Sequence, residues 1–302
     1  MWLNIQIFGF RALWSPYFIL FLICIGIFYY LITGPLRHNF GEHEKPSIGQ
    51  QIIFYSGLVV LYIIKGSPVD LLSHIMLSAH MIQMAVLYFI FPIFMLKGIP
   101  VWIWKKIINI PVFKHIFKFL TIPLVAVLIF SAALALYHVP GIFDFTKSSK
   151  IIHAISTIVI LFFSFTMYWP VIPPIKEHDK MQPLLKMAYL IFSSIIITIA
   201  CALIIFAESV LFKSYTADGP WIQALSLCVP SDVLSGLAST ISGPEMFSPL
   251  SARDDQQLGG IIMKFMQEIV YAVIIGRIFF SWFSKDRMKV DPIPEETFSE
   301  QN

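Results

Sequence analysis

The sequence predicts an all-α fold: a polytopic integral membrane protein built as a bundle of seven transmembrane helices. Three observations support this class. Of the 302 residues, 57% are hydrophobic and only 13% are charged. The mean hydropathy of +0.78 is far above that of ordinary soluble domains. Seven apolar stretches are long enough, at about 1.5 Å per helical residue, to cross or nearly cross a hydrocarbon core of about 30 Å.

The seven predicted spans lie near residues 15–33, 48–64, 71–96, 119–137, 151–169, 184–206 and 258–282. Helices are favoured over barrel strands because the apolar runs are about twice as long as a barrel strand requires and lack period-two alternation. Together these spans form one transmembrane domain, residues 1–282. Residues 207–257 are predicted as a long loop containing a short surface helix or a re-entrant segment. Residues 283–302 are predicted as a flexible tail, because they combine prolines with carboxylates.

The distribution of positive charge predicts the orientation. Thirteen Lys and Arg residues lie in the loops after spans one, three and five and in the tail, against six on the opposite side. Because cytoplasmic loops carry the excess of positive charge, the N-terminus is predicted outside and the C-terminus in the cytoplasm. The net charge of +3 is small and scattered among helix flanks, so no nucleic-acid partner is expected.

Four of the eight histidines lie at or near the predicted outer ends of spans three, four and five: His74, His80, His138 and His153. On one helix, His74, His80, Met81 and Met84 would fall within about 120° of one another. Span three would then present two imidazoles and two thioethers to a single neighbour. A lone histidine at a membrane interface is more often a capping or snorkelling residue. Four at one depth favour a shared functional interior.

Neutral imidazole and thioether form a borderline-to-soft ligand set, which suits copper and above all Cu(I). Zinc is less favoured, because structural zinc sites rely on thiolates and Cys228 is the only cysteine outside the spans. A bis-histidine haem between span three and span four or five is the alternative. The spacing of the histidines does not separate copper from haem.

Two acidic residues, Asp254 and Asp255, lie just before the last span, and Lys264 and Glu268 lie within it. The two aspartates are expected to cap the helix and complement its dipole. Lys264 and Glu268 have the i,i+4 spacing of an ion pair near the bilayer middle. They form either a structural pair or a proton or metal relay inside the bundle. No nucleophile–base pair or nucleotide-binding signature occurs, so the sequence does not predict an enzyme.

Five motifs occur in a fixed order along the chain: HMIQM (80–84), HVPGIFD (138–144), the histidine of IIHAIS (153), MYWPVIPP (167–174) and DQQLGG (255–260). In these motifs the chain resembles the multi-span CtaG family of cytochrome c oxidase assembly factors. The resemblance covers essentially the whole chain. Each motif alone is weakly specific, whereas five in sequence are fairly specific.

The resemblance implies a non-catalytic, multi-pass protein of the bacterial plasma membrane that is needed to form a caa-type oxidase and inserts copper. The family's outer histidines would correspond to His80, His138 and His153, and its acidic entry to the last helix to Asp255. The resemblance also implies a second histidine at the position where this chain has Met84. His74 matches no family motif and is retained on the residue argument alone.

We therefore predict transient copper binding by His80, His138 and His153. His74, Met81 and Met84 would be auxiliary ligands, and Asp144, Asp255, Lys264 and Glu268 would support the site. Copper would pass to cytochrome c oxidase subunits, with other copper-delivery proteins as further partners beside the lipid bilayer. Binding should weaken below about pH 6, where free imidazoles become protonated. A haem-handling protein and a cofactor-free assembly scaffold are the alternatives.

Overall fold

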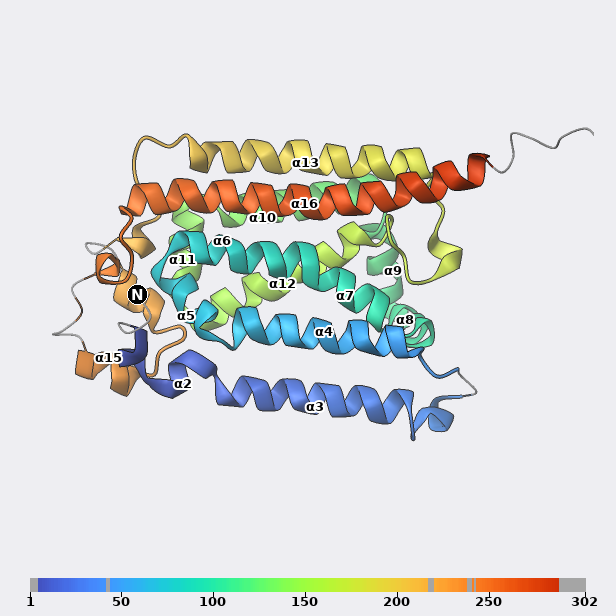
Figure 1. The fold of residues 1–302 in the computed structure, drawn as a ribbon, viewed down its shortest axis with the longest axis horizontal. Helices are drawn as coiled ribbons and strands as arrows, with labels where there is room; N and C mark the ends of the chain where they lie inside the picture. Colours follow the sequence, from blue (N-terminus) through green and yellow to red (C-terminus); the bar gives the residue numbers. More distant parts are fainter. Residues whose placement is uncertain (1–4, 42–43, 217–219, 238–240, 242, 288–302) are drawn as a thin grey trace, which may run out of the picture.

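The computed structural model describes residues 5–41, 44–216, 220–237, 241 and 243–287 (Figure 1). Within these ranges the chain folds into helices without any strand, which confirms the all-α class. Helices α3 (Pro16–Thr33), α4 (Ile48–Lys65), α12 (Lys150–Tyr168), α13 (Pro183–Ile205) and α16 (Ala252–Arg287) are each long enough to span a membrane.

The helix at the fourth predicted span is shorter than the other spanning helices. It is α10 (Pro123–Tyr137), which follows α9 (Pro111–Leu120) after a bend of 86°. In the described ranges, six helices or helix runs are long and apolar enough to span, and the α9–α10 pair brings the number to seven. The predicted number of seven spans is reached when α9 and α10 are counted together as one span.

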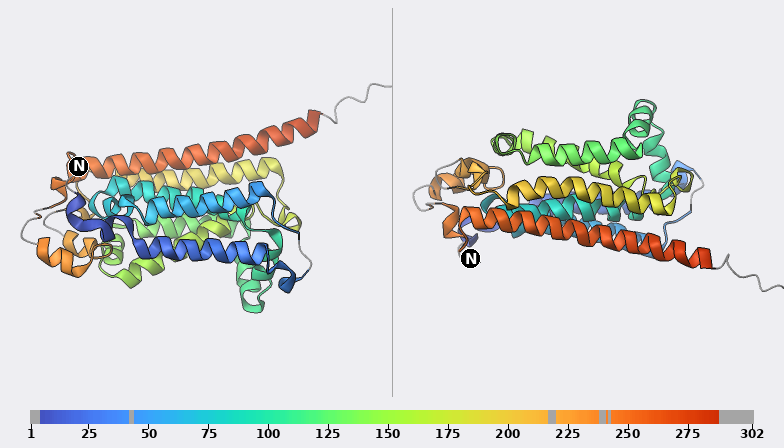
Figure 2. Two further views of the ribbon diagram at one scale, coloured as in Figure 1. Left: turned by 60° about the horizontal axis from the view of Figure 1, so that its bottom comes forward. Right: turned by 90° about the horizontal axis from the view of Figure 1, so that it is seen from above.

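The third span is the central helix of the bundle. It runs from Leu77 to Gly98, and 67% of its most apolar window is buried, whereas no other spanning helix exceeds 33%. It consists of α6 (Leu77–Ala85), the π-helical turn Val86–Ile90 and α7 (Phe91–Gly98). Helix α6 packs against α16, and α7 packs against α4. In Figures 1 and 2, α13 and α16 lie side by side along one edge of the bundle.

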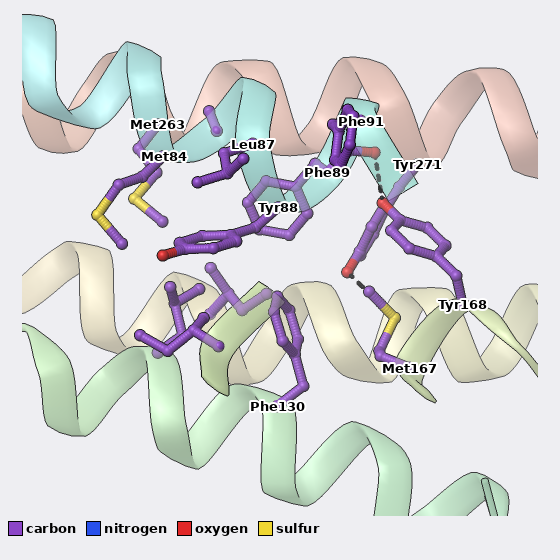
Figure 3. Packing of buried hydrophobic residues seen from close by; sticks show 14 of the residues in the cluster. Met84, Leu87, Tyr88, Phe89, Phe91, Phe130, Met167, Tyr168, Met263 and Tyr271 are labelled. Carbon is purple, nitrogen blue, oxygen red and sulfur yellow. Dashed lines mark hydrogen bonds between the residues drawn. The ribbon is translucent and has the colours of Figure 1, made fainter. Parts of the chain in front are cut away.

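Pro92 disturbs the hydrogen bonding of this central helix. It has no N–H to donate to the carbonyl four residues earlier, which belongs to Tyr88. The Ser164 hydroxyl of α12 donates to that carbonyl instead. The neighbouring Phe89 carbonyl accepts from the Tyr168 hydroxyl at 3.0 Å (Figure 3). Hydroxyl groups of α12 therefore supply the hydrogen bonds of these two carbonyl groups in the middle of the core, so no water molecule has to do so.

The prediction of one continuous helix over 71–96 was wrong at its start. The chain forms α5 (Pro68–Ile75), then an extended Met76 with φ −126° and ψ 134°, and only then α6. The Asp255 carboxylate accepts from the backbone N–H of Leu77 at 2.6 Å and of Ser78 at 3.3 Å, and also from the Ser78 hydroxyl. This tertiary contact caps α6 and lets a new helix start. His74 and His80 consequently lie on different helices.

The segments predicted as loops contain several short helices: α8 (Val101–Ile108), α11 (Pro140–Lys147), α14 (Trp221–Leu225) and α15 (Ser231–Leu237). Helix α14 packs against α5, which also packs against α2 (Gly9–Trp14). Phe8, Leu71, Trp221 and Phe247 are part of a second small hydrophobic core at this end of the bundle. The predicted surface helix of 207–257 is thus two helices packed over the end of the bundle.

The described chain begins at the end of the bundle that carries α5 and α11, and α16 ends at the opposite end (Figure 1). The predicted outer loops gather at the first end, but which end faces outside stays a prediction. Residues 283–287 of the predicted tail are helical and continue α16. The rest of that predicted tail lies outside the described residues.

Candidate functional site

The four predicted histidines gather at one end of the bundle, where each is supplied by a different helix or helix end. His74 lies in the last turn of α5, His80 in α6, His138 at the C-cap of α10 and His153 near the start of α12. The imidazoles form two pairs: the ring centroids are 5.6 Å apart in the His74–His153 pair and 6.4 Å apart in the His80–His138 pair. His74, His80 and His138 are buried, and His153 is half-buried.

Most nitrogens of three of these rings have no protein partner. Both nitrogens of His80, both nitrogens of His153 and Nε2 of His138 are buried without a hydrogen bond. Nδ1 of His138 lies 2.8 Å from the Leu134 carbonyl, which can only accept, so Nδ1 carries the proton. This tautomer leaves a free lone pair on Nε2. A buried polar group without a partner costs about 1–3 kcal/mol, so the cluster is built to receive a ligand or water.

Lys147, at the end of α11, is the residue of this cluster that sequence reasoning missed. Its side chain is only 1% exposed, and its Nζ lies 3.2 Å from Nδ1 of His74. The ammonium also lies over the rings of Phe143, at 5.5 Å, and Tyr215, at 5.6 Å. In the sequence Lys147 is only one of the six Lys and Arg residues on the predicted outer side. Its position in a short connection between two predicted spans is the feature of the sequence that could have placed it near the histidines.

Burial shifts the titration of the groups at this end. It lowers the pKa of Lys147 to about 7, with nearby Lys65 lowering it further and Asp70 opposing the shift. It also lowers the pKa of His74 well below its usual value, helped by the neighbouring Lys147. Burial lowers the pKa of His138 to about 4, against the Leu134 carbonyl, which raises it. His74 and His138 are therefore neutral at physiological pH, as metal binding requires.

Asp144 supports the cluster through the loop that covers it. Its carboxylate accepts from the backbone N–H of Lys213 at 3.2 Å and of Ser214 at 3.0 Å, and from the Ser214 hydroxyl at 2.6 Å. These bonds fix the short 3₁₀ turn Lys213–Tyr215. The Tyr215 hydroxyl donates to the Ser73 carbonyl at 2.8 Å, and its ring centroid lies 6.4 Å from that of His80. Asp144 is therefore a positioning residue.

Aromatic rings complete the surroundings of His80. Tyr137 stacks on its imidazole with centroids 6.0 Å apart, and Phe143 meets it edge-on at 5.2 Å. These rings leave the histidine nitrogens in an apolar environment. Polar contacts there are stronger than in water because the local dielectric is low.

Met81 and Met84 are both buried in the core of the bundle. Met84 lies with Met263 of α16 beside Tyr88, as Figure 3 shows. Met81 packs on α16, where a Cβ added to Gly259 would come within 3.1 Å of its Cγ. Asp255, from the same helix end, caps α6 as described above. The predicted role of Asp255 beside the site is thus structural.

Lys264 and Glu268 do form the predicted i,i+4 ion pair. Lys264 Nζ also donates to the Ser194 hydroxyl of α13 at 2.9 Å, and Ser194 in turn donates to Glu268. The Glu268 side chain is 47% exposed. The interpretation as a relay inside the bundle is wrong for this carboxylate, because α16 turns it toward the outer surface of the α13–α16 seam.

No three His, Cys, Asp or Glu side chains in the described parts of the chain are placed to hold one metal ion. A common ligand set of His80, His138 and His153 therefore stays a prediction. The pairs that the structure does bring together are His74 with His153 and His80 with His138.

The fold and this site define a class: a polytopic helical membrane protein with a buried imidazole cluster at one end. The family model described as cytochrome c oxidase caa3 assembly factor (Caa3_CtaG) matches residues 27–285, which is most of the chain. The chain belongs to this family, as its five motifs predicted. No curated protein and no solved structure matches it.

Proposed function

We propose that this protein binds copper through its buried histidine cluster and delivers the metal to a caa3-type cytochrome c oxidase during assembly, in the plasma membrane of a bacterium. The family is one of oxidase assembly factors, so membrane subunits of the oxidase are the natural partners. Such a role is non-catalytic. Copper is the cargo in this proposal and leaves the protein by ligand exchange.

One observation carries the copper proposal: five buried nitrogens on His80, His138 and His153 have no hydrogen-bond partner. Neutral imidazoles with free lone pairs are good ligands for copper. An incomplete ligand set also suits a site that must release its metal. Two hydrogen bonds hold imidazole rings in place: Lys147 contacts Nδ1 of His74, and Nδ1 of His138 donates to the Leu134 carbonyl. Neither bond involves the five nitrogens without a partner.

The size of the adjoining cavity favours a metal ion over haem. The cavity next to His138 has a free volume of about 10 Å³. That volume holds about one atom, whereas a large organic ligand needs a pocket of several hundred Å³. A haem would therefore require the helices of this end to move apart.

Copper quantification on the purified protein tests the proposal. The variant His80→Ala/His138→Ala/His153→Ala should lose most bound Cu(I), and cells carrying it should assemble little active oxidase. His115→Ala is the matched control, because this exposed histidine of α9 lies at the opposite end of the bundle (Figure 1), where its ring contacts the Pro111 carbonyl. Thermal unfolding of each variant shows whether it is folded.

The alternatives give different outcomes. Normal oxidase assembly by a folded triple variant that binds no copper would favour a cofactor-free scaffold. A strong Soret absorption band that persists through purification, without copper, would favour haem handling.

A further inference from the structure

A small cavity lies between helices of the bundle, next to the histidine cluster. Helices α6, α10, α13 and α16 each contribute to its wall. Its free volume of about 10 Å³ is the size of one water molecule or one metal ion. Five of its lining residues carry oxygen, nitrogen or sulfur in their side chains: Met81, Ser131, His138, Cys201 and Met263. The rest of the lining is aliphatic or glycine.

Two polar atoms of this lining have no partner. Nε2 of His138 and Oγ of Ser131 are both buried and unbonded, in side chains that are 8% and 2% exposed. Nδ1 of His138 is held by the Leu134 carbonyl, which orients the ring. A metal-binding histidine is commonly fixed in this way, with one nitrogen bonded to a carbonyl and the other presenting its lone pair.

We propose that this cavity is the resting position of Cu(I), bound by the thiolate of Cys201, the thioethers of Met81 and Met263, and Nε2 of His138. The inference rests on the proposed copper function. It adds two ligands that lie outside the histidine motifs, Cys201 of α13 and Met263 of α16. Two thioethers, a thiolate and an imidazole form a soft ligand set, which selects Cu(I) over harder ions.

Charge balance also favours Cu(I) at this position. On binding, the S–H bond of Cys201 breaks, a Cu–S bond forms and one proton leaves to water, without electron transfer. One Cu⁺ with one thiolate is neutral overall. A divalent ion with the same ligands would leave one uncompensated charge in an apolar interior, which costs several kcal/mol. The lining residues of the cavity include no carboxylate that would balance that charge.

His138 connects the cavity with the rest of the cluster. Its ring lies 6.4 Å from that of His80, and it also lines the cavity. An ion held by His80 and His138 therefore reaches the sulfur atoms by exchanging His80 for Cys201 and the thioethers while it stays bound to His138. Release to a partner follows the same steps in reverse. This shared ligand keeps the copper bound at each step.

X-ray absorption at the copper edge tests the proposal on the wild-type protein, loaded anaerobically with Cu(I). The expected spectrum has sulfur scatterers together with imidazole nitrogen. A shell of nitrogen and oxygen alone would overturn the inner site, and the cavity would then hold a bound water only. This measurement needs no variant, so a folding failure does not affect it.

Cu(I) affinity of two variants provides the second test. Cys201→Ser should weaken binding by roughly tenfold or more, and Met263→Leu should weaken it less, because one of two thioethers remains. The matched controls are Cys24→Ser, an exposed thiol on α3, and Met95→Leu, a buried thioether on α7. Both controls should bind as the wild type does. Equal affinity of Cys201→Ser, Met263→Leu and the controls would contradict the inner site.

The two proposals fail in different ways. Copper binding that is lost in the triple histidine variant but unchanged in Cys201→Ser and Met263→Leu would contradict the inner site and leave the proposed function standing. Absence of copper in the wild-type protein would instead remove the proposed function and the inner site with it.

Discussion

The ammonium of Lys147 lies where it would repel a bound metal cation. It is 3.2 Å from Nδ1 of His74 and almost fully buried. Burial lowers its pKa to about 7, so the group is charged below pH 7 and neutral above it. Copper affinity should therefore keep rising as the pH increases through 7. Burial lowers the pKa of His138 to about 4, so that ligand stays neutral well below the pH 6 expected from free imidazole.

Lys147→Met removes this cation while keeping an apolar side chain of similar length. We expect the variant to bind Cu(I) more tightly than the wild type at pH 6, and to show a flatter affinity profile between pH 6 and pH 8. Competition with a Cu(I)-specific chelator measures both quantities. Lys150→Met, at an exposed lysine at the start of α12, is the control. An unchanged pH profile in Lys147→Met would contradict the assigned role.

At the scale of elements, the start of α6 depends on a residue 178 positions away along the chain. Asp255 of α16 accepts from the backbone N–H of Leu77 and Ser78 and from the Ser78 hydroxyl. These donors belong to the first turn of a helix, which has no partners of its own for them. Asp255 thus stabilises the start of the helix that carries His80.

Asp255→Ala should lower the free energy of unfolding by roughly 2 kcal/mol, because it leaves the first N–H groups of α6 unpaired inside the bundle. Thermal unfolding in detergent gives the loss as a shift in Tm. Asp232→Ala, at an exposed aspartate in the first turn of α15, should shift Tm much less. Equal shifts for the two variants would argue against the cap.

Some element boundaries could be predicted from sequence and one could not. Prolines occupy the first position of α5, α10, α11 and α13, where a helix tolerates them. Met76 offers no such signal, because no proline or glycine lies beside it. The break there results from a tertiary contact with Asp255, which local sequence does not encode.

At the scale of the whole molecule, the bundle places α5, α11 and the histidine cluster at one end and α8 and α9 at the other (Figure 1). The distribution of Lys and Arg predicts that the histidine end faces outside. Single-cysteine labelling of intact cells tests this orientation, in a background where the three native cysteines, Cys24, Cys201 and Cys228, are serine.

Lys150→Cys should react with a membrane-impermeant maleimide in intact cells, whereas Lys105→Cys of α8 should react only after the cells are permeabilised. Both lysines are exposed. The opposite pattern would place the histidine end in the cytoplasm and reverse the predicted orientation.

The sequence predicts at which end of the bundle the histidines lie, but it does not predict which of their rings pair. Span ends fix the level of each residue along the membrane normal, so the histidines could be placed at one end from sequence alone. Which rings pair depends on how helices pack side by side. For that reason Lys147, Cys201 and Met263 could not be assigned to the cluster or its cavity before the helices were placed.

Helix α16 joins this end of the bundle to the other as a single rod. Its 36 residues correspond to about 54 Å at 1.5 Å per residue, longer than a bilayer core is thick. Its first turn carries the cap of α6, and its last turn lies beyond the opposite end of the bundle (Figure 1). A displacement of that far end along the helix axis would therefore act on Asp255 and, through its bonds to Leu77 and Ser78, on the first turn of α6. In the proposed copper delivery, a partner that binds the far end of α16 would thereby act on the end of the bundle that holds the histidines.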